Sequence, residues 1–171
     1  MDNEIKIYIA DLAAYNNGIL HGIWVDACIS LDEIQEQIDS LLKSSPVGNS
    51  EEIAIHDYEG FEDLKIGEYE GLQPVHDKAL FIQEHGKLGA ALLKHHSVDF
   101  EEAGKSIKEH YRGEYKSVAN YAQELTEQTS EVPKHLVSYI DYEKMARDME
   151  LSGDIFKIKL GFEKVHIFWN H

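Results

Sequence analysis

Hydrophobic and polar residues alternate at the start of the chain, in "IKIYIA", where Ile5, Ile7 and Ile9 are separated by Lys6 and Tyr8. A period of two is typical of a strand with one buried face. "YNNG" (15–18) has turn chemistry, with Asn17 and Gly18 both able to adopt positive φ, and "ILHGIWV" (19–25) follows as a second apolar stretch. We therefore expect a β-hairpin here.

A helical period replaces the alternation after "SLDE" (30–33), in which Ser30 and Glu33 have the spacing of a capping box. A helix is predicted over 31–42, with Leu31, Ile34, Ile38, Leu41 and Leu42 on its inner face. Its acids would then face solvent. "EEIAIHDY" (51–58) predicts a third strand, and residues 1–60 therefore form a small ββαβ unit.

Helices dominate the remaining pattern until the last residues. Pro74 suits a first helical position and Gly86 a helix end, which predicts helices over 74–85 and 87–96. A further helix is expected near 99–110, and "YRGEY" (111–115) is interpreted as a connection. Taken with the segments that follow, the order of elements favours an α+β fold.

The C-terminal third is predicted to hold more helices and a second hairpin. Val118, Tyr121, Ala122 and Leu125 share one face of a helix within "KSVANYAQELTEQ". Two helical pieces follow from Pro133, and "DIFKIKL-GFE-KVHIFW" reads as a terminal hairpin.

Composition adds a strong negative charge to this picture. The chain of 171 residues has 32 acidic and 16 basic side chains, and its net charge is −16. Such a chain repels nucleic acid and anionic membranes, so a basic protein is the expected partner. Residues 1–61 hold 12 acids against 2 bases, whereas 101–171 hold 13 against 10. The negative field is therefore expected to be strongest in the N-terminal third.

Targeting signals and disulfides are not expected. "MDNEIKIYIADL" has neither a basic n-region nor a long apolar run, and no stretch approaches the roughly 20 residues that span a bilayer. Cys28 is the only cysteine, so no internal disulfide can form. We expect a soluble cytoplasmic protein.

Enzymatic and metal-binding motifs are incomplete. His95 and His96 are adjacent, and on a helix they would point about 100° apart. "AGKS" (103–106) has Asp99 where a P-loop needs its first glycine, and a calcium loop starting at Asp148 would end on Lys159 rather than glutamate. Cys28 follows a strand, where a buried thiol is common. We predict no catalytic residue, no metal and no cofactor.

Four blocks resemble the ArdA family of antirestriction proteins: "IYIADLAAYNNGILHGIWVD" (7–26), "EEIAIHDYEGF" (51–61), "YKSVANYAQEL" (115–125) and "EVPKHLVSYIDYEKMARDMELSGDIF" (131–156). The family is carried by conjugative elements and phage-like DNA. The resemblance implies an elongated homodimer of three small domains, here 1–61 (α+β), 62–103 (helical) and 104–171 (α+β with the dimer contact). Its carboxylates would replace DNA phosphates in the DNA-binding groove of type I restriction-modification enzymes, at their methyltransferase/specificity core.

Charge density is compatible with that implication. B-DNA carries one charge per roughly 1.7 Å of axis, so 32 carboxylates equal the charge on about 54 Å of duplex. The expected phosphate-mimicking carboxylates, called here the mimic acids, are Asp26, Asp32, Glu33, Glu36, Asp39, Glu51, Glu52, Glu59, Glu62, Asp63, Glu68, Glu70, Glu101, Glu102, Glu109, Glu114, Glu124, Glu127, Asp148 and Glu150.

Two further roles stay open at this point. Asp57 either belongs with the mimic acids or holds a turn. Leu136, Val137, Tyr139 and Ile140 are expected near the dimer contact by resemblance, the alternative being ordinary core.

Two other functions compete with mimicry. The first is an acidic adaptor that binds another basic DNA-associated protein. The second is a small hydrolase that uses Cys28 or the histidines, which predicts loss of function when those residues are replaced.

Overall fold

The computed structural model describes residues 4–171, and the chain in it divides into two compact units. The first unit ends at Lys94 and the second is His95–His171. Both contain helices and an antiparallel sheet, which confirms the predicted α+β class. The division into domains 1–61, 62–103 and 104–171 stays a prediction, and its first three residues lie outside the described residues.

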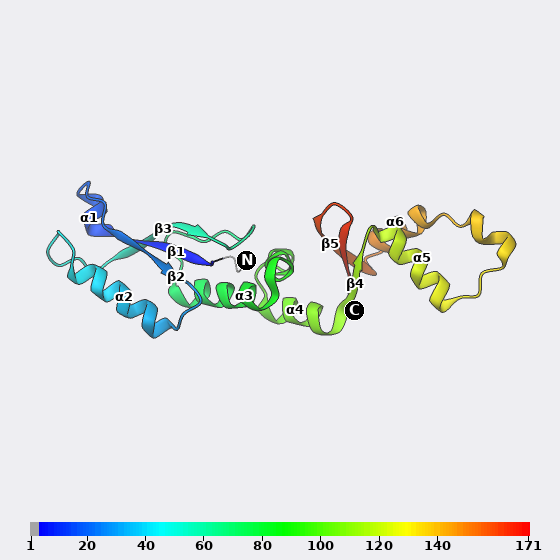
Figure 1. Ribbon diagram of the computed structural model, residues 1–171, viewed down its shortest axis with the longest axis horizontal. Coiled ribbons are helices and arrows are strands. Elements are labelled where there is room, and N and C mark those ends of the chain that lie inside the picture. The colour runs from blue at the N-terminus through cyan, green and yellow to red at the C-terminus, as the bar shows by residue number, and fades with distance from the viewer. Residues whose placement is uncertain (1–3) are drawn as a thin grey trace. The chain divides into compact units, whose positions relative to one another are not determined.

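The first unit is built on a three-stranded sheet in the order β2-β1-β3 (Figure 1). β1 is Lys6–Asp11, β2 is Gly22–Asp26 and β3 is Ile53–Glu59. β1 pairs antiparallel with both neighbours. Its alternate residues Ile7 and Ile9 are buried, as the period of two predicts.

The predicted hairpin is confirmed as an antiparallel strand pair, and Asn17 and Gly18 form a turn, but a short helix makes the connection longer than predicted. A one-turn helix, α1 (Leu12–Asn16), follows β1 directly because Asp11 accepts a hydrogen bond from the N–H of Ala14. Gly18 takes the left-handed conformation at φ 74°, whereas Asn17 does not, at φ −96°. The second strand consequently starts at Gly22 rather than near residue 19.

The helix predicted over 31–42 is α2, Leu31–Lys43. The Ser30 hydroxyl accepts from the N–H of Glu33, and the Glu33 carboxylate accepts from the N–H of Ser30, so the capping box is present. Ile34, Ile38 and Leu41 are buried, and α2 contacts β1 and β2. Amphipathic spacing therefore positioned this helix correctly.

β3 is an edge strand whose outer side is partly covered by the following loop. The N–H of Ile55 donates to the carbonyl of Glu68 at 2.9 Å. The loop ends where α3 (Leu72–His95) begins. Gly86 interrupts this helix with φ 66° and ψ −152°, so the predicted break is confirmed, although Pro74 is the third helical residue rather than the first.

The second unit contains a strand that the sequence did not predict. After α4 (Phe100–Lys105) and a π-helical turn (Ser106–His110), β4 (Tyr111–Tyr115) pairs with β6 (Lys164–Trp169), and β5 (Ile155–Gly161) pairs with the other side of β6. The interpretation of "YRGEY" as a connection is wrong, since β6 supplies an edge for it to pair with. The terminal hairpin is confirmed.

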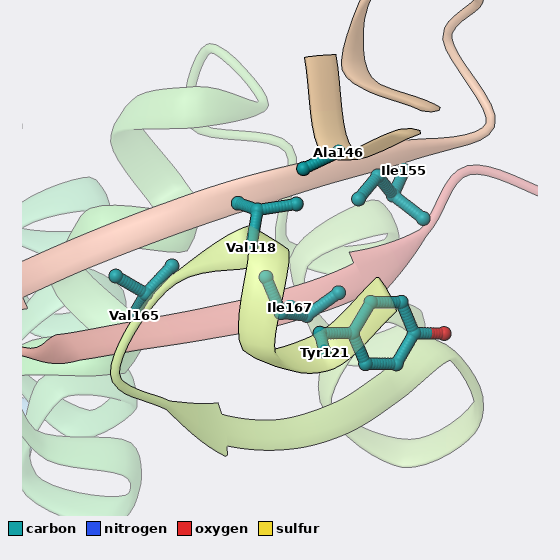
Figure 2. Close-up of a cluster of buried hydrophobic side chains, with 6 residues drawn as sticks. All are labelled: Val118, Tyr121, Ala146, Ile155, Val165 and Ile167. Carbon is teal, nitrogen blue, oxygen red and sulfur yellow. The ribbon is translucent and has the colours of Figure 1, made fainter. Parts of the chain in front are cut away.

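Helices α5 (Val118–Thr129) and α6 (Tyr142–Leu151) pack on this sheet. Figure 2 shows the cluster they form with it, made of Val118, Tyr121, Ala146, Ile155, Val165 and Ile167. Leu125 packs against the cluster partly buried, which confirms the predicted helical face. Between the helices lies a 3-10 turn, Lys134–Tyr139, the first of the two predicted helical pieces.

Candidate functional site

The outer face of α2 presents four mimic acids. Asp32, Glu33, Glu36 and Asp39 are all exposed. Glu33 also serves the capping box, and Asp39 accepts a hydrogen bond of 2.9 Å from the side chain of Gln35. These bonds fix the two carboxylates on the helix while leaving them in contact with solvent.

A second group of acids surrounds the end of the sheet. Lys6 lies between the carboxylates of Glu4 and Glu59, with its Nζ 3.5 Å from an oxygen of each. Coulomb attraction to Glu4 and Glu59 raises the pKa of the Lys6 ammonium. The charge of Glu59 is therefore partly compensated within the unit.

A shallow hollow of about 540 Å³ lies among Glu4, Asp26 and Glu62. Gly60 lines it and has φ 86°, and a Cβ at this position would come 2.5 Å from the carbonyl oxygen of Glu4. Only glycine fits there without displacement. The turn after β3 thus brings Glu62 to the end of the sheet where Glu4 and Asp26 lie, and Lys87 lines the same hollow.

Other mimic acids of the first unit precede β3 or lie in the loop after it. Glu51, Glu52, Glu62, Asp63 and Glu68 are exposed. A Glu68 oxygen is 3.3 Å from Nε2 of His56. Glu70 differs because it is half-buried and accepts a hydrogen bond from the buried ammonium of Lys78.

The mimic acids of the second unit are more often paired with bases. Lys105 lies 3.8 Å from Glu101 and 3.3 Å from Glu102. Glu150 is half-buried and 3.0 Å from Nζ of Lys157. The exposed members are Glu101, Glu102, Glu109, Glu114, Glu124, Glu127 and Asp148.

Asp57 lies within β3 and is exposed, with its Oδ1 accepting from the N–H of Tyr58 at 2.8 Å. The turn role considered for it is wrong, because the residue is in a strand. Asp26 is held in a similar way, with its Oδ1 accepting from the N–H of Cys28 at 2.8 Å.

The apolar segment around the 3-10 turn is on the surface. Leu136 is 44% exposed, Val137 49% and Tyr139 82%, while Ile140 is half-buried. The alternative that these residues are ordinary core is therefore wrong for the first three. Ile140 also lines an open groove along α6, together with Met145 and Met149.

The residues considered for a hydrolase, Cys28 and two of the histidines, lie in environments that offer little support for catalysis. Burial and the nearby Asp26 raise the pKa of the half-buried Cys28 thiol, which disfavours a nucleophilic thiolate. The His95 ring stacks on Phe156 with centroids 4.1 Å apart, and Nε2 of His96 is 2.8 Å from Oγ of Ser106. Ser106 is only 2% exposed.

The described residues contain neither a metal-binding cluster nor a membrane-spanning helix. Across residues 4–171, no cluster of three or more His, Cys, Asp or Glu side chains is arranged to hold a metal ion. Within that range no helix is both long and apolar enough to cross a membrane.

Sequence reasoning missed some contributors to this surface. One is Glu4, which shares Lys6 with Glu59. The others are Tyr8 on β1 and Trp24 on β2, which lie directly opposite each other. The alternation in both strands was the available signal, because it places these aromatic residues on the face opposite Ile7 and Ile9.

The family model described as Antirestriction protein (ArdA) matches residues 7–164. The comparison with curated proteins finds no match.

Proposed function

The chain belongs to the ArdA family of antirestriction proteins, and from this premise we propose that it acts as a DNA mimic. Its carboxylates occupy the DNA-binding groove of a type I restriction-modification enzyme, at the methyltransferase/specificity core, and exclude DNA. The protein acts as a cytoplasmic homodimer without catalysis, and it protects a mobile genetic element entering a new host.

The observation that carries the proposal is the exposure of the mimic acids on folded elements. All of them except Glu70 and Glu150 are exposed. Several are held by hydrogen bonds from residues close in sequence, such as Asp26 and Asp39. Binding therefore avoids part of the entropic cost of ordering these groups.

Electrostatics would act on the rate as well as on the affinity. A net charge of −16 attracts a basic groove over a distance and speeds encounter. This surface presents no bases for the sequence-reading residues of the enzyme to recognise, so it inhibits enzymes with different target sequences in the same way. Added salt weakens the interaction because exposed charge pairs are screened.

Two of the mimic acids are left out of the proposed binding surface because they are paired with lysines. Glu70 and Glu150 are half-buried and bonded to Lys78 and Lys157, so we assign them to structure rather than to the groove. The exposed acids of α2, together with Asp26, Glu51, Glu52, Glu62 and Asp63, remain the strongest candidates. The apolar segment at Leu136, Val137 and Tyr139 is proposed as the dimer contact.

Competition with DNA tests the proposal directly. A labelled duplex bound to a purified type I methyltransferase should be displaced by excess protein at constant ionic strength. Glu36→Lys/Asp39→Lys should weaken displacement about tenfold or more, because each reversal turns an attraction into a repulsion. Glu84→Lys/Glu143→Lys is the matched control, since it changes net charge equally at exposed acids outside the mimic set.

The outcomes separate mimicry from the alternatives. Failure to displace DNA, together with binding to other basic proteins, would favour the acidic adaptor. Equal weakening by both double variants would show that only net charge matters and would contradict the proposed surface. Loss of inhibition in Cys28→Ala, with no effect of Glu36→Lys/Asp39→Lys, would favour the hydrolase.

A further inference from the structure

One face of the first sheet carries aromatic and charged side chains instead of apolar ones. On β1, Lys6 lies opposite Asp26 of β2 and Glu59 of β3, and Tyr8 lies opposite Trp24 and Asp57. Directly opposed residues of antiparallel strands point to the same face. The other face, with Ile7, Ile9 and Val25, is the buried one.

The aromatic residues form a platform on this face. The ring centroids of Tyr8 and Trp24 are 5.4 Å apart with an interplanar angle of 58°, and Trp24 is 41% exposed. Gly22 makes room for the pair, because a Cβ there would come 2.6 Å from Cζ and Oη of Tyr8. We call Tyr8 and Trp24, with the adjacent Asp26, Asp57 and Glu59, the Tyr8–Trp24 platform.

A cation already sits on the platform. Nζ of Lys6 lies 5.2 Å from the Trp24 ring centroid and 3.5 Å from the Glu59 carboxylate. An aromatic face next to carboxylates is the combination that attracts an organic cation. The position of the Lys6 ammonium therefore indicates that the platform suits an organic cation.

We propose that the Tyr8–Trp24 platform docks an arginine side chain from the basic groove of the partner enzyme. This inference rests on the proposed function and deepens it, because it names a specific contact beyond phosphate-like charge. The arginine stacks on Trp24 and pairs with a carboxylate of the platform, displacing Lys6.

Arginine fits better than other ligands for two reasons. Its planar guanidinium stacks on aromatic rings and bonds carboxylates through two parallel N–H groups, which an ammonium does not do. A nucleobase would also stack, but the adjacent acids repel its phosphate. Asp26 and Asp57 are held by backbone N–H groups at 2.8 Å, so their carboxylates are preorganised.

The first test is competition for the methyltransferase with substitutions at Trp24. Trp24→Leu removes the aromatic face and should weaken displacement of DNA about two- to fivefold, the range expected for an exposed cation–π contact. Trp24→Phe keeps an aromatic ring and should retain most of the affinity. Tyr69→Leu, at a 70% exposed aromatic residue of the same unit, is the control and should have no effect.

Substitution of Lys6 should change the displacement of DNA in the opposite direction. Lys6→Met removes the resident cation and should strengthen displacement more than Lys43→Met, which removes the same charge from the end of α2. A merely structural role of Lys6 would weaken binding instead.

The final experiment titrates the protein with two non-aromatic peptides, (Arg-Gly)₄ and (Lys-Gly)₄, at matched ionic strength while its fluorescence is recorded. Subtracting the Trp24→Phe spectrum isolates Trp24, because Trp169 is common to both proteins. The arginine peptide should change Trp24 emission at severalfold lower concentration. Equal responses to both peptides, or wild-type displacement by Trp24→Leu, would overturn the inference. Failure of the wild-type protein to displace DNA would instead overturn the proposed function.

Discussion

The ammonium of Lys78, on α3, is buried and donates a hydrogen bond to the carboxylate of Glu70, in the loop that precedes the helix. A buried charge is tolerated only when a partner compensates it. This pair therefore ties the loop to α3, and it explains why Glu70 differs from the exposed acids around it.

Replacing Glu70 should consequently reduce stability. Glu70→Gln leaves the ammonium of Lys78 without its counter-charge, and we expect a loss in the free energy of unfolding toward the lower end of about 3–5 kcal/mol, since Glu70 keeps some solvent contact. Chemical denaturation measures this. Adding Lys78→Met should recover much of the loss, and a double variant as unstable as the single one would contradict the explanation.

The capping box of α2 gives a smaller and more local prediction. Ser30→Ala removes the acceptor for the N–H of Glu33 and should cost about 1 kcal/mol of stability. Ser30→Asp, which restores an acceptor, should recover most of it. If the two variants had equal denaturation midpoints, the cap would not contribute measurably.

Stability of the second unit should fall in mild acid. Burial lowers the pKa of His95 and of His166 below the usual 6.5; the neighbouring His96 lowers that of His95 further, whereas Glu114 partly opposes the shift at His166. The unfolded chain then binds more protons, so stability is full above pH 6.5 and decreases as the pH falls below it.

His95→Phe tests this pH dependence while preserving the stack on Phe156. Its free energy of unfolding, measured between pH 7.5 and 5.5, should vary less with pH than that of the wild-type protein. An unchanged slope in His95→Phe would contradict the assignment.

The exposed apolar segment predicts the effect of a charge on assembly. Val137→Asp places a carboxylate where we propose the dimer contact, and sedimentation should then show a monomer at concentrations where the wild-type protein is a dimer. Phe162→Ser is the control, because Phe162 is 85% exposed but lies in the turn between β5 and β6. A monomeric wild-type protein would refute the proposed homodimer.

Local chemistry explains which parts of the fold were predictable. The capping box at Ser30, the break at Gly86 and the final hairpin each depend on residues close in sequence, and all three are confirmed. β4 was missed because its pairing depends on β6, which lies about fifty residues further along the chain. Five residues with a central glycine carry almost no strand signal of their own.

The candidate surface likewise has features that were predictable from nearby residues and features that depended on the tertiary fold. Exposure of the α2 acids followed from helical spacing, whereas the pairing of Glu70 with Lys78 required the tertiary fold. Aromatic residues on the open face of the sheet were visible in the alternation, but their opposition across β1 and β2 depends on the strand register.

The edges of the first sheet bear on how the protein behaves at high concentration. Exposed strand edges invite pairing with other chains, which leads to aggregation. Here β3 is partly capped by the bond from Ile55 to Glu68, and β2 is only five residues long and ends in Asp26. A stoichiometric inhibitor, as we propose this protein to be, must accumulate without precipitating. The two edge strands end in Asp26 and Glu59, and their exposed backbone offers a neighbouring chain little to pair with.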